Sequence, residues 1–415
     1  MKLSSFLGAL LPIFPSTLAL PNISFESRCD TLKGGFNHSN TKVLVAAYVP
    51  AGTNLAFLGS VNDTNCLQYV ISRADVCRLR LNVTTSSTSR VVVEVFMPVD
   101  WSSKGKRSLM VGNAGLGGLA ANSLGFAAIG HDNGHPGDTA KYFLNRPEVI
   151  KDYVWRALRE ARIAGKAAIH SFYGEVVQNS YYMGCSTGGR QGLEAAQEFP
   201  GDYDGIVSGA PAINFLGIIA QLAKIFKTTG TFGALTFLNK DQWARVRMTL
   251  DQCDGIAGVV DGVLEYPMKN NGTKLIMYHG LHDSFISSEN SYNYYDSVSR
   301  TMELPSQKLD EFYRFFPIPG LEHCYSGSGS WNIGSASQNT PDSASVIDSS
   351  DSVLMKMVDW VEKGIAPEVL TGRKIVNGVV VAEKNHCKYP SQNTYKGVGN
   401  PSLASSWECR HNRLA

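Results

Sequence analysis

The sequence predicts an α/β fold in which a mostly parallel β-sheet is covered by helices on both faces. Two observations predict it: short apolar runs of strand length recur along the chain, and segments with helical periodicity alternate with them. Parallel neighbours in a sheet need this alternation, because the chain must cross back over the sheet between them. With 415 residues, the chain is long enough for one large domain that carries an insertion.

Six short apolar runs are predicted to form strands of this sheet. The first stops at Pro98, and the second leads into the glycine cluster that begins at Gly112. In chain order, the predicted strands are Val91–Phe96, Leu109–Val111, Phe126–Ile129, Ser180–Met183, Gly205–Ser208 and Lys274–Tyr278.

Three segments are predicted to be helices: Ile150–His170, Gly188–Phe199 and Ser352–Glu362. In the first and the last, apolar residues recur every three or four positions with polar residues between them. Gly364 and Pro367 end the last helix. The stretch 327–350 is rich in Ser, Asn and Gly and is interpreted as a surface loop.

The overall composition is that of a folded chain with a nearly neutral surface. Hydrophobic residues make up 43% and charged residues 18%, which excludes a disordered chain. The net charge is +2, and no long run of Lys or Arg occurs. We therefore expect neither nucleic acid nor a membrane surface as a partner.

The first 19 residues have the layout of a secretory signal peptide. One positive charge at Lys2 precedes the apolar run 3–11, and small residues at 15–19 offer a cleavage site. That run is too short to span a bilayer, and no later segment is long enough. The mature chain is expected to begin near Leu20.

Cysteines and glycosylation sequons agree with secretion. The chain has eight Cys and no Cys-x-x-Cys pair of the kind that binds zinc, so disulfides in an oxidising compartment are expected. Five Asn-x-Ser/Thr sequons begin at Asn22, Asn37, Asn62, Asn82 and Asn271. The sequence thus predicts a secreted, extracellular glycoprotein.

Residues 184–188, Gly-Cys-Ser-Thr-Gly, match the G-x-S-x-G pattern of a nucleophile elbow. In an elbow a strand enters a sharp turn and a helix follows, so that the serine hydroxyl is exposed at the carboxyl end of the sheet. A predicted strand precedes Ser186 and a predicted helix follows it. These neighbours favour an elbow over a plain glycine-rich turn.

A serine nucleophile needs a general base, and the base needs an acid to orient it. Asp283 follows the strand Lys274–Tyr278 and its exit turn, where such an acid would lie. His323 follows an aromatic run and is the best-placed base. Four other histidines are assigned different roles: His279 and His282 as hydrogen-bonded strand-end residues, and His131 and His135 as residues of the pocket wall.

Cysteines adjoin two of these candidates. Cys185 immediately precedes Ser186, and Cys324 immediately follows His323. A disulfide between them would hold base and nucleophile together across a long stretch of chain. The alternative, two unrelated structural cysteines, does not account for this double adjacency.

These residues resemble the tannase/feruloyl esterase family of secreted fungal and bacterial esterases. The resemblance rests on residues 184–192, on Tyr278-His279-Gly280 with Asp283, and on His323-Cys324. It extends to Gly112-Asn113, Asn133-Gly134-His135 and the segment 205–211, and covers most of the chain from Cys29 to Cys409. It implies an α/β-hydrolase domain that carries a lid.

The resemblance also implies the roles of particular residues. Ser186, Asp283 and His323 would form a catalytic triad, with a disulfide between Cys185 and Cys324. Further family disulfides correspond to Cys29 with Cys77 and to Cys387 with Cys409. Cys66 and Cys253 lack family partners, so they are either free or paired with each other.

A serine esterase also needs two hydrogen-bond donors for the oxyanion of its intermediate. The backbone N–H of Thr187 is expected to be one of them, because it follows the nucleophile. The second should come from the loop Gly112–Gly118, where Ala114 and Gly115 are the candidates.

The resemblance divides the chain into a signal peptide (1–19), two catalytic parts (20–215 and 273–415) and an intervening lid (216–272). The lid is shortened, because Tyr266-Pro267 leads almost directly into a predicted strand. Within it, a family calcium loop would take carboxylates or carbonyls from Asp254, Val259, Asp261 and Val263. The family's remaining acidic position is Ala257, so a glycine-rich turn without metal is the alternative.

We therefore expect a secreted serine carboxylic ester hydrolase without an organic cofactor. Its substrates would be phenolic esters, such as the hydroxycinnamoyl (feruloyl-type) esters of plant cell walls. Tannase activity on gallate esters is one alternative, and a homologue impaired by the lid deletion is another. A peptidase of the same fold is a more distant alternative.

Overall fold

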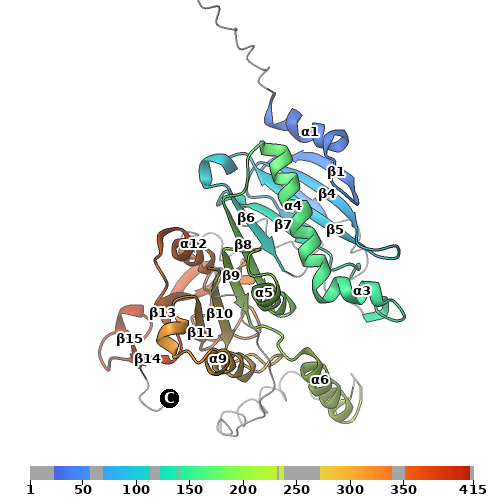
Figure 1. Cartoon of the computed structure of the whole chain (residues 1–415). Coiled ribbons are helices and arrows are strands. Elements are labelled where there is room, and N and C mark those ends of the chain that lie inside the picture. Colours follow the sequence, from blue (N-terminus) through green and yellow to red (C-terminus); the bar gives the residue numbers. More distant parts are fainter. Residues whose placement is uncertain are drawn as a thin grey trace, which may run out of the picture.

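The structure, a computed structural model, describes residues 23–56, 69–112, 122–137, 140–230, 233–237, 272–338 and 351–411. Its centre is a nine-stranded mixed sheet with the strand order β1-β4-β5-β7-β6-β8-β9-β10-β11 (Figure 1). These strands are β1 (Thr41–Val49), β4 (Val76–Thr84), β5 (Arg90–Pro98), β6 (Arg107–Val111), β7 (Ala127–His131), β8 (Asn179–Cys185), β9 (Gly205–Gly209), β10 (Lys274–Gly280) and β11 (Tyr313–Ile318).

The sheet is parallel over most of its width. From β7 to β11 every neighbouring pair is parallel, whereas β1, β4, β5 and β7 pair antiparallel in turn. The parallel strands are buried almost throughout, while the antiparallel strand β4 alternates buried and half-buried residues. This difference follows from helices covering both faces of a parallel sheet. The predicted α/β fold with a mostly parallel sheet is confirmed.

Helices pack on both faces of the sheet. One buried cluster joins α1, α4, α5 and α9 to one face, and a second cluster joins α12 to the other. Adjacent residues of one strand point to opposite faces: Tyr182 belongs to the first cluster, and Tyr181 and Met183 to the second. The helices are α1 (Phe25–Gly35), α3 (Pro147–Lys151), α4 (Ala157–Tyr173), α5 (Thr187–Glu198), α6 (Phe215–Thr229), α9 (Glu289–Thr301), α10 (Ser306–Leu309) and α12 (Val353–Lys363).

The six strands and three helices expected from the sequence are all present, with ends shifted by a few residues. The first predicted helix is interrupted by a π-helical turn, Asp152–Arg156, between α3 and α4. The buried Asp152 carboxylate in this turn accepts hydrogen bonds from the hydroxyls of Thr85 and Ser89, which tie the helix to the end of the β4–β5 hairpin.

Several elements were not predicted from the sequence. They include α1, β1, β4, β11 and α9, which extend the sheet or cover it. Three two-stranded sheets were also missed, namely β2 (Asn54–Ala56) with β3 (Tyr69–Ile71), β12 (Val369–Val376) with β13 (Val379–Cys387), and β14 (Ser391–Tyr395) with β15 (Trp407–His411).

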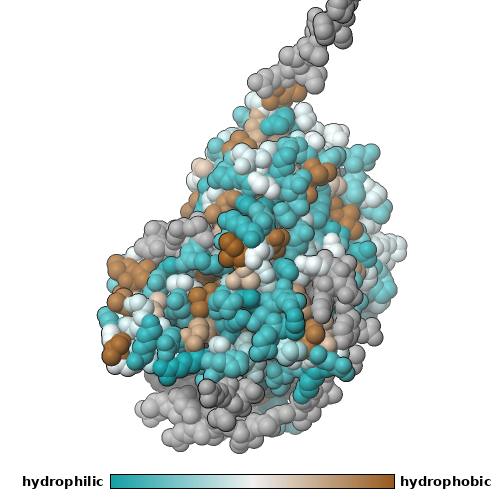
Figure 2. Space-filling view, turned by 60° about the vertical axis from the view of Figure 1, so that its left-hand side comes forward, coloured by the Kyte–Doolittle hydropathy of each residue, from teal (hydrophilic) through white to brown (hydrophobic). Residues whose placement is uncertain are grey.

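On the face shown in Figure 2, hydrophilic residues cover most of the described surface, and hydrophobic ones form small separate groups. Such scattered apolar groups are normal on a folded protein. Within the described ranges, no helix has the length and apolarity needed to cross a membrane.

Candidate active site

Ser186 lies in the sharp turn between β8 and α5. Its backbone has φ 62° and ψ −120°, a conformation that non-glycine residues rarely adopt. Its N–H donates to the carbonyl of Gly209, 2.9 Å away, which ties the turn to the neighbouring strand β9. A Cβ atom on Gly184 would lie 2.6 Å from the carbonyl oxygen of Gly188, so the glycines on either side of the turn let the backbone pass closely. These features are the geometry of a nucleophile elbow.

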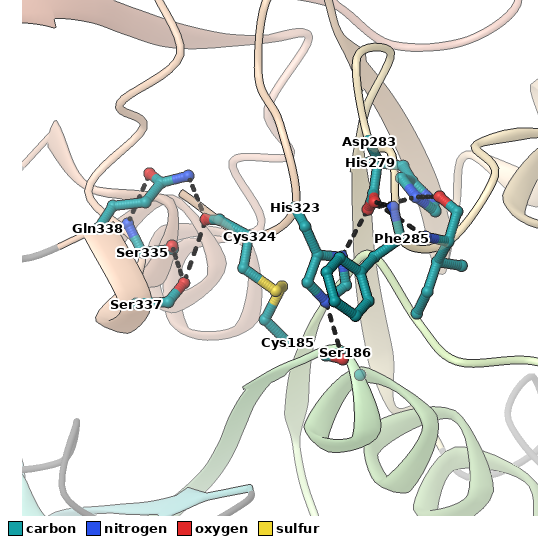
Figure 3. The surroundings of a disulfide bond; sticks show 12 residues. Cys185, Ser186, His279, Asp283, Phe285, His323, Cys324, Ser335, Ser337 and Gln338 are labelled. Atoms are coloured by element: carbon teal, nitrogen blue, oxygen red, sulfur yellow. Dashed lines mark hydrogen bonds and ion pairs between the residues drawn. A yellow bond between two sulfur atoms is a disulfide. The ribbon is translucent and has the colours of Figure 1, made fainter. Parts of the chain in front are cut away.

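Two further side chains from distant parts of the chain meet Ser186. His323 Nε2 lies 2.9 Å from Ser186 Oγ, and His323 Nδ1 lies 2.7 Å from Asp283 Oδ2 (Figure 3). Asp283 follows β10 and His323 follows β11, and these strands run parallel to β8 in one sheet. Their carboxyl ends therefore meet at the same edge. The structure brings together the three residues that the sequence singled out.

The side chain of Asp283 is fully buried and has several donors around its carboxylate. Oδ1 accepts the backbone N–H groups of Phe285 and Ile286, at 2.8 and 2.9 Å. Oδ2 faces both His323 Nδ1 and, at 3.2 Å, His279 Nε2. Burial by itself raises the pKa of this carboxyl, but the hydrogen bonds from His279 and His323 outweigh it and hold the pKa below its ordinary value. Asp283 is therefore an anion that faces the imidazole of His323.

A disulfide between Cys185 and Cys324 joins the elbow to the loop of His323, with a Cα–Cα distance of 6.0 Å. On the other side of this bridge, the Cys324 carbonyl accepts hydrogen bonds from Gln338 Nε2 and Ser337 Oγ (Figure 3). The residue that directly follows His323 is thus anchored through both its side chain and its backbone, which restricts where the His323 ring can lie. Disulfides also join Cys29 to Cys77 and Cys387 to Cys409.

The four other histidines singled out from the sequence have partners of their own. His282 Nδ1 accepts the N–H of Gly320, and His279 is hydrogen-bonded beside the end of β10, as the sequence indicated for both. His131 is buried at the end of β7, where Nδ1 accepts the N–H of Asn133 and burial lowers the imidazole pKa to about 4. His135 stacks on the rings of Tyr142 and Tyr153.

Only one of the expected oxyanion donors lies in the described part of the chain. Thr187 is the first residue of α5, so its N–H is among those that no helical carbonyl accepts. Gly112, which follows β6, packs against Gly188 in the first turn of that helix. The expected donor Gly115, like its alternative Ala114, lies outside the described residues.

The ring of Phe285 was not anticipated from the sequence. It stacks on the His323 imidazole with a centroid distance of 5.5 Å, and 63% of the residue is exposed. The sequence feature that could have indicated this contact is the position of Phe285, two residues after the candidate acid Asp283. The anchoring of Cys324 by residues 337–338 was also missed, because those residues fall in a stretch interpreted only as a surface loop.

The expected metal ligands Asp254, Val259, Asp261 and Val263 lie outside the described residues, as do Cys66 and Cys253. Within the ranges that the structure describes, no group of three or more His, Cys, Asp or Glu side chains is arranged to hold a metal ion.

Comparison with known proteins identifies the family. The family described as tannase and feruloyl esterase matches this chain over residues 75–271 and 265–410. A probable feruloyl esterase B of Emericella nidulans is 32% identical over 98% of this chain and 100% of its own length. A probable feruloyl esterase B-1 of Aspergillus fumigatus is 34% identical over 93% of this chain and 96% of its own length.

Solved structures agree with this match. A crystal structure of an esterase from Aspergillus oryzae superposes with a TM-score of 0.81 at 31% identity, covering 93% of this chain and 100% of the other. Feruloyl esterase B from the same organism gives a TM-score of 0.80 at 30% identity, with the same coverage. A tannin acyl hydrolase from Aspergillus niger, at 16% identity, shares the fold with a TM-score of 0.64. This chain therefore belongs to the tannase and feruloyl esterase family of carboxylic ester hydrolases.

Proposed function

We propose that this chain hydrolyses aromatic carboxylic esters of the feruloyl type through an acyl-enzyme formed on Ser186. The proposal rests on two contacts of the His323 ring. Its Nε2 lies 2.9 Å from Ser186 Oγ, and its Nδ1 lies 2.7 Å from Asp283 Oδ2. Feruloyl esterases B among the relatives support the substrate class. A phenolic ester of the plant cell wall is the proposed natural substrate.

Each step of the proposed reaction can be assigned to one of these three residues. His323 Nε2 takes the proton of Ser186 as Oγ bonds to the ester carbonyl carbon. The C–O bond to the alcohol then breaks, and His323 returns the proton to the departing oxygen. The same ring then deprotonates a water molecule as the water oxygen bonds to the acyl carbon. The C–O bond to Ser186 breaks, the acid leaves, and His323 returns the proton to Ser186 Oγ. Asp283 keeps the hydrogen on His323 Nδ1 and stabilises the imidazolium.

The oxyanion of each tetrahedral intermediate would be held by two backbone donors. The Thr187 N–H supports the first assignment, because it lies at the start of α5 with no helical acceptor. Gly115 is the proposed second donor, on the loop after Gly112. The N-terminal end of α5 adds a favourable partial positive charge.

Apolar and aromatic side chains beside the site support an aromatic acyl group. Phe285 lies over His323. Ala212, whose N–H donates to the Ser186 carbonyl, packs in one cluster with Ile218 and Ile286. Planar aromatic rings bind well against such surfaces.

We also propose that a shortened lid, residues 216–272, lies between the two catalytic parts 20–215 and 273–415. Support comes from the alignment with the Emericella nidulans relative, which extends over 535 positions although this chain has only 415 residues, so this chain contains gaps in it. The family match also falls into two parts that meet at 265–271. In α6, within this segment, Leu216 and Phe226 are exposed by 82% and 62%.

A Ser186→Ala variant should lose essentially all turnover of methyl ferulate, because no other group in the path can form the acyl-enzyme. Initial rates with methyl ferulate, methyl caffeate and methyl gallate measure both the activity and the preference. Ser287→Ala, which changes an exposed turn serine near Asp283, is the matched control and should keep its rate. Preference for the gallate ester would favour tannase activity, and equal rates for wild type and Ser186→Ala would refute the esterase proposal.

Removing the bridge with Cys185→Ser and Cys324→Ser together should lower kcat by about tenfold or more, because the loop of His323 loses its covalent link to the elbow. The fold should survive this change, as circular dichroism can check. The paired variant Cys387→Ser with Cys409→Ser removes a disulfide elsewhere in the chain and serves as control. Wild-type kcat without the Cys185–Cys324 bond would contradict its proposed role.

A structural calcium ion in the lid is proposed from sequence alone, with Asp254 and Asp261 as carboxylate ligands and Val259 and Val263 as carbonyl ligands. If the ion is bound, EDTA should lower the melting temperature and added calcium should restore it, because binding to the folded state stabilises it. Asp254→Asn with Asp261→Asn should abolish the EDTA effect. A melting temperature unchanged by the chelator favours a turn without metal.

Secretion is proposed from residues 1–19 and the sequons. The exposed Asn37 should carry a glycan, whereas Asn82 should not, because its Oδ1 is buried and its strand is paired on both edges. Expression of the full chain in a filamentous fungus, followed by mass spectrometry of the medium, measures both points. Recovery of the chain only from cells, with residues 1–19 attached, would contradict secretion.

A further inference from the structure

A second imidazole lies behind the proposed catalytic acid. His279, the penultimate residue of β10, is fully buried, and its Nε2 lies 3.2 Å from Asp283 Oδ2. The same Nε2 lies 3.0 Å from the carbonyl oxygen of Ile286. In Figure 3 the Asp283 carboxylate lies between the rings of His279 and His323. The mechanism above gives His279 no part.

The surroundings of His279 determine which of its ring nitrogens carries the hydrogen. A carboxylate and a backbone carbonyl face Nε2, and both can only accept, so Nε2 must be a donor. On the other side, Nδ1 lies 2.7 Å from the hydroxyl oxygen of Ser291, a fully buried residue in the first turn of α9. With the hydrogen on Nε2, Nδ1 accepts the Ser291 hydroxyl hydrogen, and every polar atom of the ring has a partner.

We infer that His279 is a positioning residue for ester hydrolysis, which holds the Asp283 carboxylate in the orientation that His323 requires and is itself oriented by Ser291. This inference rests on the proposed function, since it assigns Asp283 the part of the catalytic acid.

The turn that carries Asp283 shows how His279 would act. Asp283 Oδ1 accepts the N–H of Ile286, and the carbonyl of Ile286 accepts from His279 Nε2. His279 therefore contacts this turn at two points: the Asp283 carboxylate at its start and the Ile286 carbonyl at its far end. Phe285, which lies over His323, belongs to the same turn. Without the His279 donor, a buried carbonyl loses this partner and the carboxylate is free to turn away from His323.

A merely structural His279 would behave differently. It would only connect β10 to α9, so its loss would lower the melting temperature without changing the rate of each folded molecule. A positioning role predicts a loss of kcat that depends on the Asp283 carboxylate. The two roles can therefore be separated by measuring rates on folded protein in two backgrounds.

The test compares His279→Leu, which removes the donor, with His279→Gln, whose amide can donate in its place. One readout is the second-order rate of Ser186 phosphonylation by a fluorophosphonate, in which Oγ–P forms, fluoride leaves and His323 takes the proton. The other is kcat and KM for methyl ferulate. His279→Leu should lower kcat and the phosphonylation rate by about 10- to 100-fold, with KM within about twofold.

Three variants keep the test decisive. His279→Gln should recover to within about fivefold of wild type, since it restores a donor to Asp283. His282→Gln, a histidine in the same turn that contacts Gly320 instead of Asp283, should match wild type. Ser291→Ala should reduce kcat by about three- to tenfold with KM unchanged, and it tests the same inference if His279→Leu does not fold.

A double-mutant cycle tests the route through Asp283. In an Asp283→Asn background, His279→Leu should change the phosphonylation rate by less than about twofold, because the carboxylate that it orients is gone. A loss of the same size in both backgrounds would overturn the inference. So would wild-type phosphonylation of His279→Leu, or equal losses in His279→Leu and His279→Gln. Wild-type protein that is phosphonylated but leaves methyl ferulate intact would refute only the proposed substrate.

Discussion

The hydrogen bond of 2.9 Å between Ser186 and His323 joins parts of the chain that are 137 residues apart, and the arrangement of the site depends on it. It can form because β8, β10 and β11 are parallel members of one sheet, whose carboxyl ends deliver Ser186, Asp283 and His323 to a single edge. The strained backbone of Ser186 raises its hydroxyl above that edge. The Cys185–Cys324 disulfide then fixes the separation of the two loops covalently.

Behind Ser186 and His323 lies a layer of buried polar groups, each of which has a hydrogen-bond partner. The Asp283 carboxylate is surrounded by two backbone N–H groups and two imidazoles, and the carbonyl of Cys324 is held by Ser337 and Gln338. Buried polar groups require such partners, and a network that satisfies them restricts the site to one arrangement. Ser186, His323 and Asp283 are thus already in contact within the described residues, without any large motion.

Family membership and the local geometry support different parts of the functional conclusion. Matches over nearly the whole chain establish a carboxylic ester hydrolase fold, whereas the contacts of Ser186, His323 and Asp283 support the mechanism. The proposed preference for feruloyl over gallate esters rests on the feruloyl esterases among the relatives and on the aromatic and apolar side chains beside Ser186.

The sequence by itself determined the features that depend on neighbouring residues. Ser186 was recognisable because a glycine-rich turn between strand and helix has a local signature, and Cys185 and Cys324 were informative because each adjoins a candidate residue. Five of the six parallel strands, all except β11, were recognisable as short apolar runs, since both of their faces are buried. Only the tertiary structure decided the antiparallel pairing of β1, β4 and β5, the stacking of Phe285 on His323, and the link from Ser291 through His279 to Asp283. These features depend on which segments become neighbours in space. The sequence around a single His, Ser or Phe does not indicate which residue it will contact.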